Sequence, residues 1–266
     1  MKISVVTTFH KAGYEKYGRR MIQTFLATWP KEVTLHVYAE DVVVDETADN
    51  LVVHDLHKES IDLVEFKNRW RGVPKANGDV SDDPVRSKRK DAGKGFKWDA
   101  VRFAHKVYSI FHCAKTCDSD MLLWMDADMV CHSPITQAKL EELCGRGDLC
   151  FLGRAGKYTE CGLYSMNLQS RGIQMFLDRF QQFYDDAENG IFKLEEWHDS
   201  FVFDAVRQSM GLKEFNWSAG IISGEGHPLI NCEWGAYLDH LKGDRKTTGK
   251  SLKKDLRVRR SEDYWK

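Results

Sequence analysis

The chain has no apolar stretch that approaches the ~20 residues needed to span a lipid bilayer. Residues 1–8 have the pattern of a strand and lack the long apolar region and cleavage site of a signal peptide. A Cys-x-x-Cys pair is also missing, and the seven cysteines have no spacing typical of a zinc site. We therefore expect a cytoplasmic protein whose cysteines are reduced and mostly buried.

An excess of charge of one sign is absent as well, because 39 Lys and Arg oppose 40 Asp and Glu. The cations are nevertheless concentrated in two segments, residues 86–106 and residues 242–260. Two basic segments in a neutral protein predict that anionic ligands are bound locally. The alternative is a solvated charged surface, which is the interpretation we favour for the last ~10 residues.

Apolar residues follow strand and helix periods in alternation. Residues 3–9, 33–39 and 51–53 have strand patterns, and residues 14–29 have helical spacing. Strand, helix and strand in this order predict an α/β protein with a mostly parallel sheet. Further helices are expected at 96–111, 135–144, 170–185 and 195–209, and further strands at 122–130, 148–153 and 160–167. Without an internal repeat or a low-complexity linker, we expect a single domain.

Two regions lack such periodicity. Residues 71–95 combine glycine, proline and basic residues, which is typical of a long loop. Loops longer than ~15 residues in compact domains are usually functional or disordered. We expect this one to border the functional site and to close as a lid over a bound ligand. Residues 215–235 are expected to be irregular, with short strand pieces.

The most informative segment is an apolar run, Leu122 to Met125, that ends in Asp126-Ala127-Asp128. A run of this type predicts a buried strand, and residues two apart on a strand point to the same face. Open α/β sheets bind ligands at the carboxyl ends of their strands. Two carboxylates there need a counter-charge, which a divalent cation bridging to a phosphate supplies. The alternative is that the aspartates form a helix cap or a turn.

A second motif, His-x-x-Gly-x-x-Lys, is formed by His240, Gly243 and Lys246. A neutral imidazole from His240 completes a metal site. Gly243 allows the backbone to approach a phosphate closely, and Lys246 is a point charge suited to a diphosphate oxygen. The alternative for His240 is a structural histidine near a helix end.

Together the two motifs resemble the GT-A glycosyltransferases, most closely the glycogenin and lipopolysaccharide galactosyltransferase group. The family's motifs occur here in its order, as Met125 to Asp128, Gly162 to Asn167, Trp197-His198-Asp199 and His240 to Lys246. The resemblance implies a Rossmann-like GT-A fold, a mixed but mostly parallel sheet flanked by helices. It also implies one domain over residues 1–266, with a nucleotide-sugar-binding half, an acceptor and catalytic half, and a basic tail, at 1–130, 131–250 and 251–266.

The resemblance implies transfer of a hexosyl or pentosyl group from a nucleotide-diphosphate sugar, with a UDP-sugar as the expected donor. Mn²⁺ or Mg²⁺ would be held by Asp126, Asp128 and His240. The acceptor would be a hydroxyl on a saccharide, on a protein or on a hydroxylated nucleic-acid base. The chain departs from the family where Ser200 replaces the Gln after Asp199, and where Thr247 follows Lys246 in place of Pro. The sugar, the acceptor and the stereochemical outcome therefore stay open.

Asp199 is the expected carboxylate near the anomeric carbon, as a base or as a group that orients hydroxyls, and Glu160 is a second catalytic candidate. Thr7, Thr8 and Phe9, at the end of the first strand, are expected to line the nucleoside pocket, although Phe9 also fits a core position. Positive charge against the departing diphosphate is expected from Arg102, Lys106 and Lys246. For Lys106 the alternative is a solvated helix face. The donor-binding set is completed by Ala127 and Gly243.

Two other classes of protein remain as alternatives. A nucleotidyltransferase shares the sheet and the metal requirement, but it typically has a Gly-rich basic loop after its first strand. Residues 7–13 contain a single glycine at that place. A non-catalytic module that binds polyanions or nucleic acid would explain the basic segments, but not the pairing of Asp-Ala-Asp with His240. Metal dependence separates the binding module from the enzymes.

Overall fold

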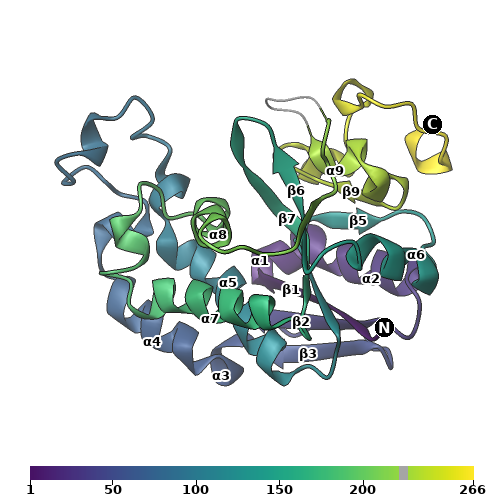
Figure 1. Cartoon of the computed structure of the whole chain (residues 1–266), viewed down its shortest axis with the longest axis horizontal. Helices are drawn as coiled ribbons and strands as arrows, with labels where there is room; N and C mark the ends of the chain where they lie inside the picture. Colours follow the sequence, from purple (N-terminus) through teal and green to yellow (C-terminus); the bar gives the residue numbers. More distant parts are fainter. Residues whose placement is uncertain (222–226) are drawn as a thin grey trace.

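The computed structural model describes residues 1–221 and 227–266 of the chain. These residues form a seven-stranded sheet in the order β3-β2-β1-β4-β7-β6-β8, flanked by helices (Figure 1). The strands of this sheet are β1 Ile3–His10, β2 Thr34–Glu40, β3 Leu51–Asp55, β4 Met121–Met125, β6 Leu149–Arg154, β7 Lys157–Asn167 and β8 Glu214–Asn216. A separate two-stranded sheet pairs β5 Met129–Cys131 with β9 Leu238–His240.

Strands β3, β2, β1 and β4 are parallel to one another, while β7 is antiparallel to both β4 and β6. The helices are α1 Lys11–Gly13, α2 Arg19–Thr28, α3 Leu56–Glu59, α4 Ile61–Trp70, α5 Ala100–Thr116, α6 Gln137–Cys144, α7 Arg171–Asp185, α8 Asp199–Gln208, α9 Pro228–Asn231 and α10 Arg245–Thr248. The fold class predicted from the sequence, α/β with a mostly parallel sheet flanked by helices, is confirmed.

Both faces of the sheet are buried at β4, which explains why this strand is continuously apolar. In β4, Leu122 and Trp124 pack into the core on the side of α5, α7 and α8. Leu123 and Met125 point to the opposite core, which contains α2 and Trp234. Successive residues of a strand alternate between faces, so this single run supplies both cores.

The strand expected over residues 122–130 is interrupted. Strand β4 ends at Met125, and Asp126 to Asp128 form a turn in which Met129 N–H donates to the Asp126 carbonyl at 3.1 Å. The chain then leaves the large sheet as β5. The sequence predicted that the two aspartates point the same way because both belong to a strand. This reason was wrong, because a turn and not a strand positions them.

Other predicted elements differ mainly at their ends. The helix expected from residue 96 begins at Ala100, where the Asp99 side chain caps it. The strand expected over 160–167 begins at Lys157, after a hairpin turn at Gly156, whose φ of 72° favours glycine. Within the region expected to be irregular, residues 215–235, residues 222–226 lie outside the described residues.

The loop of residues 71–95 projects from one end of the molecule, and the C-terminal segment lies at the other end (Figure 1). The C-terminal segment is anchored, because Trp265 is buried and its indole N–H donates to the Gly235 carbonyl at 2.7 Å. The Ser251 hydroxyl also donates to Asp239 at 2.6 Å. Among the described residues, no helix combines the length and the apolar character that crossing a membrane requires.

Candidate active site

The two aspartates and the distant histidine meet at the carboxyl end of β4. Nε2 of His240 lies 3.0 Å from Asp128 Oδ1 and 3.5 Å from Asp126 Oδ2. The pairing of β5 with β9 creates this contact, because His240 lies opposite Met129, the residue after Asp128. The Leu241 N–H also donates to the Asp128 carbonyl at 2.9 Å. The structure therefore brings together all three residues predicted to bind a metal.

Gly162 on the neighbouring strand β7 makes room for the histidine ring. A Cβ atom at this position would lie 2.5 Å from Cε1 and 2.7 Å from Nδ1 of His240. Such distances are below van der Waals contact, and the histidine is almost fully buried. The glycine is therefore required by the close approach of an imidazole.

Replacing Gly162 with Ala is expected to destabilise the protein by about 1–3 kcal/mol, because the new methyl group overpacks the buried ring. Urea-induced unfolding at neutral pH measures the change. Gly211→Ala is the matched control, since no atom lies within 4 Å of its added Cβ, and a change of at most about 0.5 kcal/mol is expected. Equal effects of the two substitutions would contradict the close contact with His240.

Lys246 completes the charge arrangement around Asp128. Its Nζ lies 2.8 Å from Asp128 Oδ2 and 4.8 Å from the centre of the Tyr17 ring. Burial opposes ionisation of Asp128, but the His240 ring and the Lys246 ammonium hold the pKa of this carboxyl well below its ordinary value. Asp128 is therefore a carboxylate at neutral pH, as a metal ligand must be. Tyr17 was not singled out in the sequence, where it is one of several apolar residues of a helix.

Lys106 is buried between two carboxylates. Its Nζ lies 3.1 Å from Asp126 Oδ1 and 2.7 Å from Asp199 Oδ2. Burial opposes the charge, but these carboxylates raise the pKa of Lys106 well above its ordinary value. The alternative of a solvated helix face is therefore wrong for Lys106. Arg102, one turn earlier on α5, is exposed and does not share its position.

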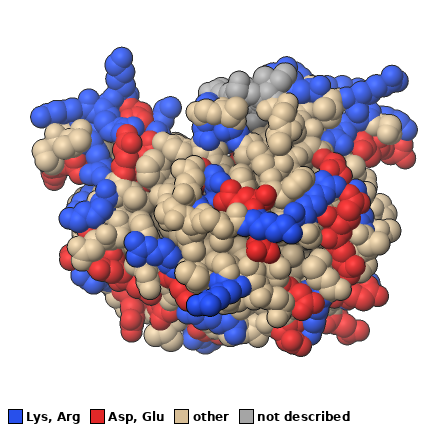
Figure 2. All heavy atoms as spheres, viewed as in Figure 1, with Lys and Arg blue, Asp and Glu red and all other residues tan. Residues whose placement is uncertain are grey.

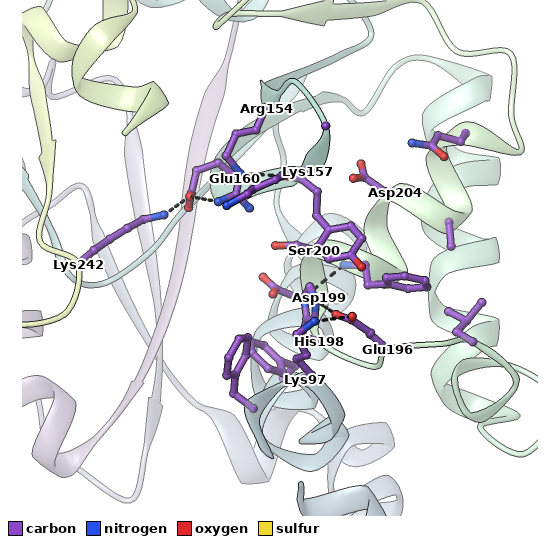
Figure 3. A pocket seen from close by; sticks show the side chains of 18 residues that line it. Lys97, Arg154, Lys157, Glu160, Glu196, His198, Asp199, Ser200, Asp204 and Lys242 are labelled. Atoms are coloured by element: carbon purple, nitrogen blue, oxygen red, sulfur yellow. Dashed lines mark hydrogen bonds and ion pairs between the residues drawn. The ribbon is translucent and has the colours of Figure 1, made fainter. Parts of the chain in front are cut away.

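Asp199 is the first residue of α8, and the imidazole of His198 caps this helix by accepting the Phe201 N–H at 3.3 Å. Burial raises the pKa of Asp199, but Lys106 and His198 lower it below its ordinary value. The side chain lines a cleft of about 1010 Å³ between α8 and the β6–β7 hairpin (Figure 3). Ser200, the residue that departs from the family pattern, lines the same cleft.

Glu160 lies on the far side of the His240 ring from the two aspartates. Its Oε1 is 3.8 Å from His240 Nδ1, and its other oxygen contacts Lys242. The Nζ of Lys242 and the guanidinium of Arg154, 3.7 Å away, both face this carboxylate (Figure 3). Lys242 and Arg154 were missed in the sequence, because their proximity to Glu160 depends on a hairpin meeting the loop after β9.

The residues predicted to line a nucleoside pocket lie at the end of β1. Thr7 is fully buried, and the Thr8 hydroxyl donates to the Tyr38 carbonyl at 2.7 Å. Phe9 is 4% exposed and stacks on Tyr14 with ring centres 5.4 Å apart. Phe9 thus packs in the core, and within the described residues Thr7, Thr8 and Phe9 do not line the cleft. Their place at a nucleoside pocket stays a prediction.

Ala127 and Gly243, the two small residues of the motifs, differ in their surroundings. Ala127 is 5% exposed, between the aspartates. Gly243 has a φ of 57°, which favours glycine, and nothing lies within 4 Å of an added Cβ. An open, left-handed position beside Lys246 fits a close approach of ligand to backbone.

A second group of potential metal ligands, Glu40, His57 and His105, is present in the described residues. Glu40 Oε1 lies 3.0 Å from His105 Nε2 and 3.5 Å from His57 Nε2. The Lys67 ammonium contacts both Glu40 at 3.0 Å and His57 at 2.8 Å. Because Lys67 already supplies the cation, this group forms an ion-pair cluster.

No family model and no curated protein matches the chain. Solved structures do resemble it. The apo form of the glycosyltransferase GlyE of Streptococcus pneumoniae TIGR4 has 11% identity and a TM-score of 0.45, over 81% of this chain and 45% of that chain. The apo structure of the bifunctional glycosyltransferase WbbM has 10% identity and a TM-score of 0.45, over 81% and 38%.

The chain thus spans less than half the length of each of these solved chains. A likeness at this identity and TM-score assigns no function to the residues of the site.

Proposed function

We propose that this protein is a metal-dependent glycosyltransferase that uses a nucleotide-sugar donor. The observation that carries the proposal is the convergence of Asp126, Asp128 and His240 at the carboxyl end of a central strand, with Lys246 beside them. Lys106 connects this group to a cleft, because it contacts both Asp126 and Asp199, and Asp199 lines the cleft. A cation site, a phosphate-binding lysine and a carboxylate at a cleft are the parts that transfer of a sugar from a diphosphate requires.

The residues fit a divalent cation. One oxygen from each aspartate and one nitrogen from the histidine lie within 4.8 Å of one another. The mixed oxygen and nitrogen set suits Mn²⁺ better than Mg²⁺. His240 Nε2 faces the carboxylates, and the 3.8 Å separation of Nδ1 from Glu160 places a carboxylate on the other side of the ring. When bound, the cation neutralises charge on the departing diphosphate.

The protein side chains have separate tasks in this proposal. Lys246 binds a diphosphate oxygen and exchanges its contact with Asp128 for one with the donor. Lys106 neutralises Asp126 and Asp199 together and holds Asp199 at the cleft. Asp199, ionised at neutral pH, accepts hydrogen bonds from sugar or acceptor hydroxyls and so orients them. A UDP-sugar is the proposed donor class, and the transferred group is a hexosyl or pentosyl group.

The proposal is tested by thermal-shift and hydrolysis measurements on UDP-, GDP- and CDP-sugars, each with and without Mn²⁺. We expect one nucleotide class to raise the melting temperature only when Mn²⁺ is present, with slow release of the nucleoside diphosphate. Release of pyrophosphate from a nucleoside triphosphate and a sugar phosphate would indicate a nucleotidyltransferase. If no donor changes the melting temperature or is hydrolysed in the presence of Mn²⁺, the proposed enzymatic function is refuted and the non-catalytic binding module is favoured.

A further inference from the structure

A second cavity, of about 290 Å³, lies on the other side of the β6–β7 hairpin from the cleft. Six basic side chains line it, and we call it the basic pocket: Arg154, Lys157, Lys242, Arg245, Lys254 and Arg257. The hairpin stands between α8 and the C-terminal segment (Figure 1). Lys and Arg side chains also gather on the surface over the C-terminal segment and over the 71–95 loop (Figure 2).

Three segments that are distant in the sequence build the basic pocket. The hairpin contributes Arg154 and Lys157, the chain after β9 contributes two cations, and the C-terminal segment contributes Lys254 and Arg257. Arg257, within the last ~10 residues for which the sequence favoured a solvated surface, is exposed, and so is Lys254. The anchored backbone of this segment holds both cations at the wall of the cavity.

Carboxylates neutralise only part of this charge. Asp255 also lines the pocket and pairs with Arg245 at 2.6 Å, while Glu160 contacts Lys242. Within residues 1–221 and 227–266, no ion pair is formed by Lys254 or Arg257. Like charges gathered in a concave site repel one another, and a bound anion relieves this repulsion.

The basic pocket and the cleft share a wall. Arg154, Lys157 and Lys242 line both cavities. A ligand held in the basic pocket therefore lies directly beside the cleft that Asp199 lines. Within the described residues, Asp128 and Lys246 line neither cavity, so the pocket is separate from the proposed diphosphate site.

We propose that the basic pocket binds a phosphate group of the acceptor, while the acceptor's hydroxyl-bearing part lies in the cleft. This inference rests on the proposed function. The cleft is lined by several rings, which suit a flat or cyclic group: Phe96, Phe103, Tyr158, His198 and Phe201. The phosphate is either a monoester on a small acceptor or one phosphodiester of a nucleic-acid strand, and the test distinguishes these two sources.

The test measures binding of a short fluorescein-labelled single-stranded DNA oligonucleotide by anisotropy, and of inorganic phosphate by its competition with this probe. No nucleotide sugar is present. Lys254→Ala/Arg257→Ala removes the two exposed cations that the C-terminal segment contributes to the pocket. The matched control is Lys253→Ala/Arg259→Ala, which removes the same charge from exposed positions of the same segment outside the pocket lining.

We expect the pocket variant to weaken binding of the competing phosphate, or of the oligonucleotide, by roughly tenfold, and the control by at most about twofold. Complete displacement of the oligonucleotide by inorganic phosphate supports a small phosphorylated acceptor. Retained oligonucleotide binding with a steep salt dependence that the pocket variant flattens supports a strand.

Equal weakening in the two variants would overturn the proposal, because it would indicate diffuse charge on the segment. Failure of the wild-type protein to bind either probe would also overturn it. A third contrary result is loss of the Mn²⁺-dependent donor response in the pocket variant, which would assign the pocket to the donor. Failure of the proposed function is distinguishable, because the phosphate measurements need neither donor nor metal.

Discussion

Asp128→Asn is expected to lower donor hydrolysis and transfer by roughly a hundred- to thousandfold, and to remove the thermal stabilisation by nucleotide sugar with Mn²⁺. The substitution keeps the shape of the side chain but removes the negative charge that faces His240 at 3.0 Å and Lys246 at 2.8 Å. An amide is a poor ligand for a cation that must also bind a diphosphate. Initial rates over a Mn²⁺ titration, together with thermal shifts, measure the effect.

Asp118→Asn serves as the control for the same chemical change. Its carboxylate is 97% exposed and pairs with Lys2, away from the proposed site. We expect its rate and metal response to equal those of the wild-type protein. Full activity of Asp128→Asn at low Mn²⁺ concentration would refute the metal site, whatever the donor turned out to be.

Lys106→Met is expected to destabilise the protein by about 3 kcal/mol at neutral pH, because breaking a buried ion pair leaves uncompensated charge. The ammonium lies between Asp126 and Asp199, and it also donates a hydrogen bond to the Cys161 carbonyl. Methionine keeps the length and apolar stem of the side chain, so the loss of charge dominates. Urea-induced unfolding measures the change in free energy.

A double substitution and a control sharpen this prediction. Lys106→Met/Asp199→Asn is expected to recover a part of the lost stability, about 1 kcal/mol or more, because one of the two unpaired carboxylates is gone. Arg102→Met, one turn away on α5 and exposed, is expected to change the stability by at most about 0.5 kcal/mol. If the double variant is less stable than Lys106→Met alone, the ion pair with Asp199 does not exist as described.

The pH dependence of these variants follows from the same contact. Lys106 and His198 lower the pKa of Asp199 in the folded state, so this pairing stabilises the protein above the ordinary pKa of an aspartate. That stabilisation is lost as the pH falls through the lowered value. The difference in stability between wild type and Lys106→Met should therefore diminish in acid, and unfolding measured at neutral and acidic pH checks this.

Local sequence patterns determined the sheet and the first half of the site. The apolar run before Asp126 predicts a strand buried on both faces, and its residues do supply both cores. The strand, helix and strand order over residues 3–53 predicts parallel pairing, and β1, β2 and β3 are parallel neighbours in the sheet. These features depend on periodicity and burial, which neighbouring residues in the chain express directly.

The predicted partnership of His240 with the Asp-Ala-Asp motif came from motif order, and the reason for their contact is tertiary. Strand β5 leaves the sheet after Asp128 and pairs with β9, which sets His240 against the carboxylates. Gly162 belongs to a third strand, β7. That a side chain would not fit at this position is visible only from its contact with the His240 imidazole. The hydrophobic periodicity of a sequence does not predict contacts between residues so far apart in the chain.

The pattern of charges in the sequence did not show which charged side chains are buried, and the structure does. The sequence predicted the same role for Arg102 and Lys106, yet Arg102 is exposed and Lys106 is buried between Asp126 and Asp199. The sequence suggested a solvated surface for the last ~10 residues, and Arg257 is exposed there, but only the structure shows that Trp265 anchors this segment and that Lys254 lines a pocket with the hairpin. The sequence by itself determined the fold class and the residue types of the site. Only the tertiary structure decided which charges face one another, because pairing and desolvation depend on surroundings that distant segments supply.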